Sequence, residues 1–174
     1  MHNDDSINRR TFVGEVASTT AAFTIVPSHV LGKRHVAPSD KLNVACIGVG
    51  GMGANDVRGM GANENIYALC DVDARNAADS FNAFPKAKRY KDYREMLDKE
   101  GRNIDAVTVS TPDHSHAMAA MTVLRAGKHV DTQKPLTRTI WEARQLAAEA
   151  ARRPKQATQM GNQGHANEGT RQIR

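Results

Sequence analysis

The sequence predicts an α/β fold built on a doubly wound parallel sheet. The first observation is an apolar run, Val44–Ile47, that passes directly into the glycine-rich turn Gly48–Gly53. The second is an acid, Asp71, placed at the end of the next apolar run. The third is the repeated alternation of short apolar runs with longer segments of helical character, joined by short loops. Such an alternation is typical of a parallel sheet covered by helices on both faces.

Composition is that of a soluble globular domain. The chain has 174 residues, of which 40% are hydrophobic and 25% charged, enough for one core of ordinary size but not for two full domains. The net charge is +5, but there is no long basic run and only 5% of residues are aromatic. This pattern favours a solvated surface over nucleic-acid binding. Cys46 and Cys70 lie in apolar runs and are expected to be small core residues, and no spacing indicates a metal site.

Residues 1–36 differ from the rest of the chain. Asn8–Val13 contains a twin-arginine pattern, and a moderately apolar stretch follows to Leu31. We expect an export signal or disordered leader, and therefore a periplasmic protein. Glu15 and the lack of a clear cleavage site leave open a floppy arm or amphipathic helix, with a cytoplasmic protein if the leader is not functional. A membrane span needs about 20 predominantly apolar residues and is not expected.

From residue 37 onward we expect one dinucleotide-binding domain. Predicted strands lie at 42–47, 66–70, 88–90, 104–109, 129–132 and 156–160. Predicted helices lie at 51–60, 74–84, 93–99, 113–126 and 140–152. Helix ends are indicated by glycine or proline, at Gly59 and Gly61, Pro85, Gly101, Gly127 and Pro154. Asp73 and Thr139 are the expected caps at helix starts.

The turn after the first strand has the spacing G-x-G-x-x-G, formed by Gly48, Gly50 and Gly53 around Gly51 and Met52. Backbone N–H groups at the start of the following helix would hold a pyrophosphate there. We expect these five residues to contact a dinucleotide. The alternative is a tight strand–helix turn without a ligand.

Asp71 lies about 20 residues further on, where such a unit places the acid that accepts the adenosine ribose hydroxyls. A carboxylate there repels a 2′-phosphate, so we expect NAD rather than NADP. Arg75 is close enough in sequence to neutralise a phosphate, and Asp71 also has the alternative role of a helix cap.

Two further segments follow the ends of predicted strands, where the ligand of an open α/β sheet lies. Thr111 and Pro112 are placed to pass under a nicotinamide ribose. One of the two histidines His114 and His116, with His116 as the candidate, is expected either to line the cofactor cleft or to be exposed. Their spacing argues against a shared metal. Lys134 follows the strand 129–132, and its desolvation in the crevice would lower its pKa and suit it to proton transfer.

Together these pieces resemble the Gfo/Idh/MocA oxidoreductase family. The matching stretches, from Lys41 onward, are GVGGMG, CDVD, STPDHSH, QKPLT and MGNQGHANEG. The resemblance implies NAD bound at the glycine turn and at Asp71, and Lys134 as the group that assists proton transfer at a sugar or cyclitol hydroxyl. Gln133 replaces the glutamate usual before that lysine, and Asp131-Thr132 is more polar than expected.

The resemblance also implies a second, open β-sheet domain, which is missing from these 174 residues. In the family it supplies substrate contacts, a histidine that shares the acid–base work, and usually a homo-oligomer interface. We therefore expect an NAD-dependent oxidoreductase whose carbohydrate-like substrate is selected elsewhere. Two interpretations stay open beside it: an NAD-dependent glycosidase of the same fold, and a nucleotide-binding module without activity of its own.

Overall fold

A computed structural model describes residues 37, 40–162 and 168–173. The chain divides into two compact units, Met1–Asp40 and Lys41–Arg174, and the sheet lies in the second. The expected export signal at residues 1–36 lies outside the described residues. In the part of the chain that is described, no helix is long and apolar enough to cross a membrane.

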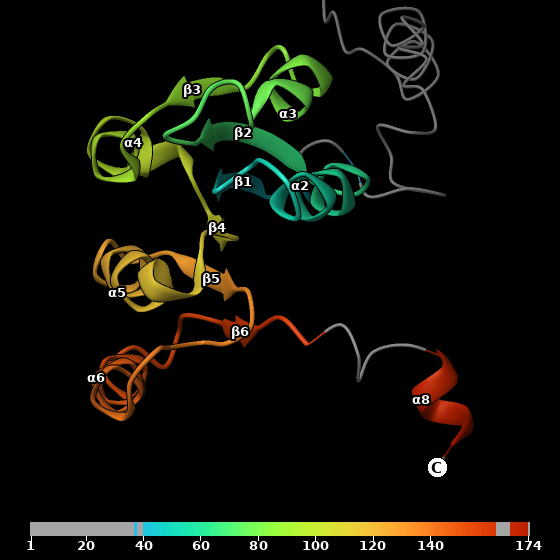
Figure 1. Cartoon of the computed structure of the whole chain (residues 1–174). Helices are drawn as coiled ribbons and strands as arrows, with labels where there is room; N and C mark the ends of the chain where they lie inside the picture. The colour runs from blue at the N-terminus through green and yellow to red at the C-terminus, as the bar shows by residue number, and fades with distance from the viewer. Residues whose placement is uncertain (1–36, 38–39, 163–167, 174) are drawn as a thin grey trace, which may run out of the picture. The chain divides into compact units, whose positions relative to one another are not determined.

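Six strands form one parallel sheet in the order β3-β2-β1-β4-β5-β6 (Figure 1). The strands are β1 Asn43–Ile47, β2 Asn65–Cys70, β3 Lys88–Tyr90, β4 Ala106–Val109, β5 His129–Thr132 and β6 Thr158–Met160. The strand order reverses direction at β1, because β2 pairs with one side of β1 and β4 with the other. A crevice opens at the carboxyl ends of the strands where the order reverses, and this is where such sheets bind ligands.

Helices cover both faces of this sheet, so the predicted doubly wound arrangement is confirmed (Figure 1). On one face lie α2 Gly53–Gly61 and α3 Ala78–Ala83. On the other lie α4 Tyr93–Glu100, α5 His116–Arg125 and α6 Ile140–Ala151. Short 3-10 turns, η2 Gly101–Asn103 and η3 Asp113–Ser115, and the helix α8 Glu168–Gln172 complete the elements of this unit.

The two faces of β1 belong to two different hydrophobic clusters, because side chains alternate along a strand. Ala45 and Ile47 pack with α4, α5 and α6, whereas Val44 and Cys46 pack with α2 and α3. Cys46 and Cys70 are buried free thiols, as predicted. Burial raises the pKa of Cys46 to about 11 and that of Cys70 to about 12, so both stay protonated near neutral pH.

Several predicted boundaries differ from the structure by two residues or more, among them the starts of α2 and β4, and three late starts have a local polar or proline cause. The helix expected from residue 74 begins at Ala78, since the Asp73 carboxylate accepts hydrogen bonds from the N–H groups of Arg75 and Asn76 and holds a turn. The helix expected from residue 113 starts as a 3-10 turn, because Pro112 is extended. The last strand starts late, because the Gln156 amide donates to two carbonyls outside the sheet.

The α4 side of the sheet edge is held by a carboxylate hub. Glu100 is buried, and its Oε2 accepts from Lys88 Nζ at 2.6 Å and from the Tyr67 hydroxyl at 2.8 Å. Its Oε1 accepts from the Tyr90 hydroxyl at 2.9 Å. These bonds stabilise the ionised form and hold the pKa of Glu100 at about 2, compared with 4.5 for an unperturbed glutamate. One carboxylate thus links α4 to β2 and β3.

We expect this hub to make folding stability acid-sensitive. Because the folded pKa lies below the unfolded one, the stabilisation is complete above 4.5 and is lost as pH falls from 4.5 through about 2. Urea unfolding midpoints should show this loss in the wild type and a much flatter acid profile in Glu100→Gln. Glu95→Gln, which removes an exposed ion pair with Lys99, is the matched control and should keep the wild-type profile. Equal profiles for all three proteins would contradict the assignment.

Candidate functional site

The glycine turn after β1 is forced by its neighbours. Gly48 has a φ of 78°, in the left-handed region that favours glycine, and its N–H donates to the Cys70 carbonyl at 2.8 Å. A Cβ at Gly48 would lie 2.7 Å from the carbonyl oxygen of Ser110, at the end of β4. A Cβ at Gly53 would overlap the Gly48 carbonyl oxygen. These glycines therefore let α2 start immediately over the ends of β1 and β4.

The Asp71 carboxylate holds this turn in place from the end of β2. Its Oδ2 accepts from the N–H of Val49 at 2.9 Å and from the N–H of Gly50 at 3.1 Å, and its Oδ1 accepts from the N–H of Asp73 at 2.9 Å. The carbonyl of Val49 accepts from the buried Ser80 hydroxyl at 2.6 Å. A carboxylate has room for about four hydrogen bonds. Asp71 can therefore hold the turn and still accept from a ribose hydroxyl.

The start of α2 is open to an anion. Its N-cap residue is Met52, and no side chain caps it. Among the described residues, the backbone N–H groups of Gly51 and Met52 have no acceptor. Nothing lies within 4 Å of the position that a Cβ at Gly51 would take. Unpaired N–H groups at a helix start fit a pyrophosphate, so the chain's own geometry fits the expected dinucleotide.

A crevice of about 550 Å³ lies over this turn, at the carboxyl ends of β1, β2 and β4. The structure brings five of the predicted cofactor residues into its walls, namely Gly48, Gly50, Asp71, Thr111 and Pro112. Sequence reasoning missed several polar residues that also line it, among them Asn76, Lys91, Tyr93 and Ser110. The Asn76 amide lies directly over Gly50, in the space that a Cβ there would occupy.

Asp56 is the most informative residue that sequence reasoning missed. It lies in the first turn of α2, and its Oδ2 accepts from the Ser110 hydroxyl at 2.6 Å and from the Gln133 amide at 2.9 Å. One carboxylate thus joins α2 to the ends of β4 and β5. The signal available in the sequence was an acid three residues after Gly53, the last glycine of the pattern and the first residue of α2.

His116 is neither exposed nor part of the crevice lining. It is 1% exposed, and its two ring nitrogens lie 2.6 Å from the carbonyl oxygens of Pro135 and Thr111. The crevice is lined instead by His114, two residues earlier. His116 therefore contacts the crevice indirectly, through the backbone of Thr111, and links that backbone to Pro135. In the described part of the chain, no group of three or more His, Cys, Asp or Glu could hold a metal ion.

Lys134 lies beyond β5 on an exposed loop, and the peptide bond to Pro135 is cis. It does not line the 550 Å³ crevice, and the described residues do not provide the desolvation that the sequence led us to expect. Asp131 of β5, by contrast, has a buried Oδ1 without a hydrogen-bond partner among the described residues. Burial, and secondarily the negative charge of Asp56, raises the pKa of Asp131.

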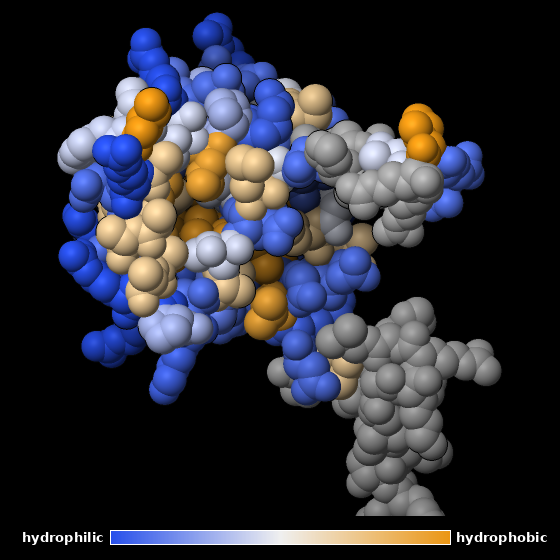
Figure 2. Space-filling view, turned by 90° about the horizontal axis from the view of Figure 1, so that it is seen from below, coloured by the Kyte–Doolittle hydropathy of each residue, from blue (hydrophilic) through white to orange (hydrophobic). Residues whose placement is uncertain are grey.

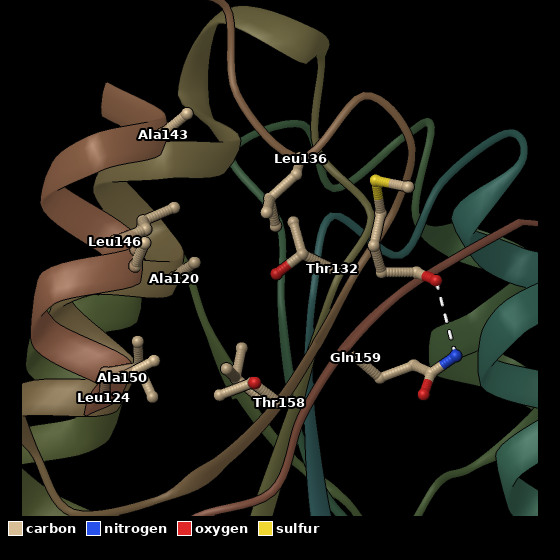
Figure 3. A pocket seen from close by; sticks show the side chains of 12 residues that line it. Ala120, Leu124, Thr132, Leu136, Ala143, Leu146, Ala150, Thr158 and Gln159 are labelled. Atoms are coloured by element: carbon tan, nitrogen blue, oxygen red, sulfur yellow. Dashed lines mark hydrogen bonds between the residues drawn. The ribbon is translucent and has the colours of Figure 1, made fainter. Parts of the chain in front are cut away.

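A second cavity, of about 300 Å³, lies between α5, α6 and the sheet edge formed by β5 and β6. Figure 2 looks onto this side of the unit, where hydrophobic residues gather among hydrophilic ones. Figure 3 shows why the cavity is there: α6 presents the small side chains of Ala143 and Ala150 beside Leu146. Thr132, Thr158 and Gln159 are the polar residues of a mostly apolar lining, and the buried Thr132 hydroxyl has no hydrogen-bond partner among the described residues. The apolar lining does not suit a dinucleotide.

Comparisons with known proteins agree with this geometry. Residues 42–161 match the oxidoreductase family GFO_IDH_MocA, described as an NAD-binding Rossmann fold. An alpha-N-acetylgalactosaminidase of Shewanella oneidensis is 29% identical over 97% of this chain. The crystal structure of myo-inositol 2-dehydrogenase from Lactobacillus plantarum is 26% identical, with a TM-score of 0.71 over 76% of this chain. GenD2 from gentamicin A biosynthesis, crystallised with NAD, is 31% identical, with a TM-score of 0.63 over 70% of this chain.

These relatives are much longer than this chain. It covers 41% of the Shewanella protein, 40% of the Lactobacillus structure and 34% of GenD2. The matched region contains the whole glycine turn, Asp71 and the loops at the ends of β4 and β5. The chain thus belongs to the Gfo/Idh/MocA oxidoreductase family and contains its NAD-binding Rossmann domain.

Proposed function

We propose that this protein is an NAD-dependent oxidoreductase that moves hydride to or from a hydroxyl-bearing carbon of a sugar or cyclitol. The observation that carries the proposal is the glycine turn, which hydrogen bonds to Asp71 hold in place below an open crevice. The chain's membership of the family agrees with it. The inositol dehydrogenase likeness supports the substrate class. NAD supplies the hydride acceptor or donor when it is bound.

The chain's own residues have distinct roles in this proposal. Gly51 and Met52 offer unpaired N–H groups to the pyrophosphate, and Gly48, Gly50 and Gly53 let the backbone come close to it. Asp71 accepts a hydrogen bond from the adenosine ribose, and its negative charge disfavours a 2′-phosphate. Thr111 and Pro112 form the wall of the crevice on the nicotinamide side. Gln133, held by Asp56, fixes the start of the loop that carries Lys134.

Lys134 is the proposed proton carrier. Its neutral amine would take up the proton of the substrate hydroxyl as hydride leaves the same carbon, and in the reverse direction its ammonium would return that proton as hydride arrives. The lysine is exposed in the described residues, so the burial that tunes such a group must come from substrate or from protein outside them.

A second candidate is an NAD-dependent glycosidase, favoured by the likeness to the Shewanella alpha-N-acetylgalactosaminidase over nearly the whole chain. Both activities would use the same cofactor cradle. They differ in net chemistry, because an oxidoreductase changes the redox state of added NAD with each turnover and a glycosidase does not.

We further propose that residues 1–36 act as a twin-arginine export signal that takes the protein to the periplasm. Support comes from Arg9 and Arg10 and the apolar stretch that follows them. We also propose a homo-oligomer, on the resemblance to the family alone. Localisation of a fusion with Arg9 and Arg10 changed to Lys, compared with the unchanged leader, tests the first proposal.

The NAD site makes a binding prediction for the chain as it stands. NAD at about a hundredfold above its Kd should stabilise the fold by roughly 2.7 kcal/mol, measured as a rise in Tm, and NADP should give a much smaller rise. Asp71→Asn should lose most of the Tm rise that NAD produces, because it removes the negative charge and a carboxylate acceptor. The difference in Tm rise between NAD and NADP should also become smaller. Asp79→Asn, an exposed acid on α3, is the control and should respond like the wild type. No Tm rise at millimolar NAD would rule out the site in this chain.

Asp56 makes a separate prediction about crevice assembly. Asp56→Asn should cost about 1 to 3 kcal/mol of unfolding free energy, because an amide cannot replace a charged acceptor for Ser110 and Gln133 together. NAD affinity should fall with it, since the ends of β4 and β5 are no longer tied to α2. Asp98→Asn, on the exposed face of α4, serves as the comparison in urea unfolding and NAD titration. Wild-type values for Asp56→Asn would show that the tie is dispensable.

Lys134 provides the test of the reaction. In the protein expressed from its own gene, added NAD should be reduced by sugars or cyclitols, with absorbance of NADH as the readout. Lys134→Ala should lower kcat roughly a hundredfold or more while leaving NAD affinity nearly unchanged. Release of N-acetylgalactosamine from a chromogenic glycoside without net NAD reduction would favour the glycosidase instead. Unchanged kcat in Lys134→Ala would remove this lysine from the mechanism.

A further inference from the structure

His116 occupies an unusual position between the two loops that flank the nicotinamide side of the crevice. It is the first residue of α5, and its ring lies between Thr111, which follows β4, and Pro135, which follows β5. Nδ1 is 2.6 Å from the Pro135 carbonyl oxygen, and Nε2 is 2.6 Å from the Thr111 carbonyl oxygen. The side chain is 1% exposed, so water does not replace either partner.

Both partners of this ring are acceptors. A neutral imidazole has one N–H and one bare nitrogen, and a bare nitrogen facing a carbonyl oxygen at this distance places two lone pairs against each other. An imidazolium has an N–H on each side and satisfies both carbonyls. We propose that His116 is a doubly protonated positioning residue that clamps the β4 loop to the Lys134-Pro135 loop. Its consequence for cofactor and substrate placement rests on the proposed function, whereas its charge state does not.

The charged groups around the start of α5 are engaged elsewhere or exposed. In the described part of the chain, no carboxylate forms an ion pair with His116. At the starts of the neighbouring helices, Asp92 pairs with Arg94, and Glu142 accepts from the backbone of Arg138 and Thr139. Titratable groups on the two clamped loops are Asp113, His114, Lys134 and Arg138, and α4 carries Tyr93, Arg94, Glu95, Asp98, Lys99 and Glu100. The two carbonyl dipoles are therefore the groups that stabilise the positive charge.

The start of a helix is a poor place for a cation, because the macrodipole is positive there. The two short carbonyl contacts oppose this effect, since hydrogen bonds from a charged donor are about twice as strong as neutral ones. Loss of one proton would leave one of the two loops without its tie. Only the charged form of the clamp therefore ties the backbone of Pro135 to that of Thr111.

The clamp has a direct spectroscopic test that needs neither NAD nor activity. Long-range nitrogen–proton spectra of the 174-residue chain, labelled with ¹⁵N-histidine, report whether each ring nitrogen carries a proton. Near neutral pH, both nitrogens of His116 should be protonated. His129 is an internal contrast, because its Nδ1 accepts from the N–H of Ala157 at 2.8 Å and must be bare. A neutral His116, with one bare nitrogen, overturns the proposal whatever the activity of the protein.

Two variants separate a clamp from simple packing. His116→Gln keeps N–H donors, whereas His116→Phe keeps a ring of similar size without any donor. We expect NAD affinity to fall roughly tenfold in His116→Phe and less in His116→Gln, since small displacements of crevice groups are costly. His129→Gln, at the opposite end of β5, should bind NAD like the wild type. Equal NAD affinity in His116→Phe and wild type would overturn the clamp, and absence of NAD binding in the wild type would instead overturn the proposed function.

Discussion

The carboxylate of Asp71 is the interaction on which the candidate site depends. It reaches from the end of β2 to the backbone N–H groups of Val49 and Gly50, and so fixes a turn in which four of the six residues Gly48–Gly53 are glycine. A glycine-rich turn loses more conformational entropy on ordering than any other, so an external tie is needed. In the proposed function, the same carboxylate carries the charge that disfavours the 2′-phosphate of NADP. Turn stability and cofactor choice are therefore linked in one residue.

The rest of the crevice is assembled by similar ties between segments that are distant in sequence. Asp56 joins the start of α2 to Ser110 and Gln133, and His116 joins the loops after β4 and β5. Each tie ends on backbone or on a side chain that itself contacts a neighbouring strand. The parallel sheet brings these carboxyl ends together, and the polar side chains then set the spacing between them. The chemistry of the crevice thus depends on buried or half-buried acceptors more than on its exposed residues.

Much of the fold follows from local pattern. The strands β3 and β5 and the helix cap at Thr139 lie where the sequence predicts them, because period, capping and glycine or proline ends act within a few residues. The late starts of α3 and α5 were not predicted, since Asp73 and Pro112 compete with the helix through their own turn chemistry. Among the residues that line the crevice, the sequence predicted Gly48, Gly50, Asp71, Thr111 and Pro112 from their spacing. It did not predict Asn76 and Lys91, because these two reach the crevice only through the folding of the β2–β3 region.

The sequence by itself determined the doubly wound parallel sheet, the glycine turn and the acid that follows it, because these depend on short-range spacing. Only the tertiary structure decided that Asp56 accepts a hydrogen bond from Gln133, and that His114 lines the crevice whereas His116 does not. Only the structure, too, decided that the buried Oδ1 of Asp131 has no hydrogen-bond partner among the described residues and that the charge of Asp56 acts on it. The physical reason is that these contacts join residues from different β–α units. Strand order and register determine which side chains meet across the ends of neighbouring strands. Neither of them can be predicted from the local spacing of residues.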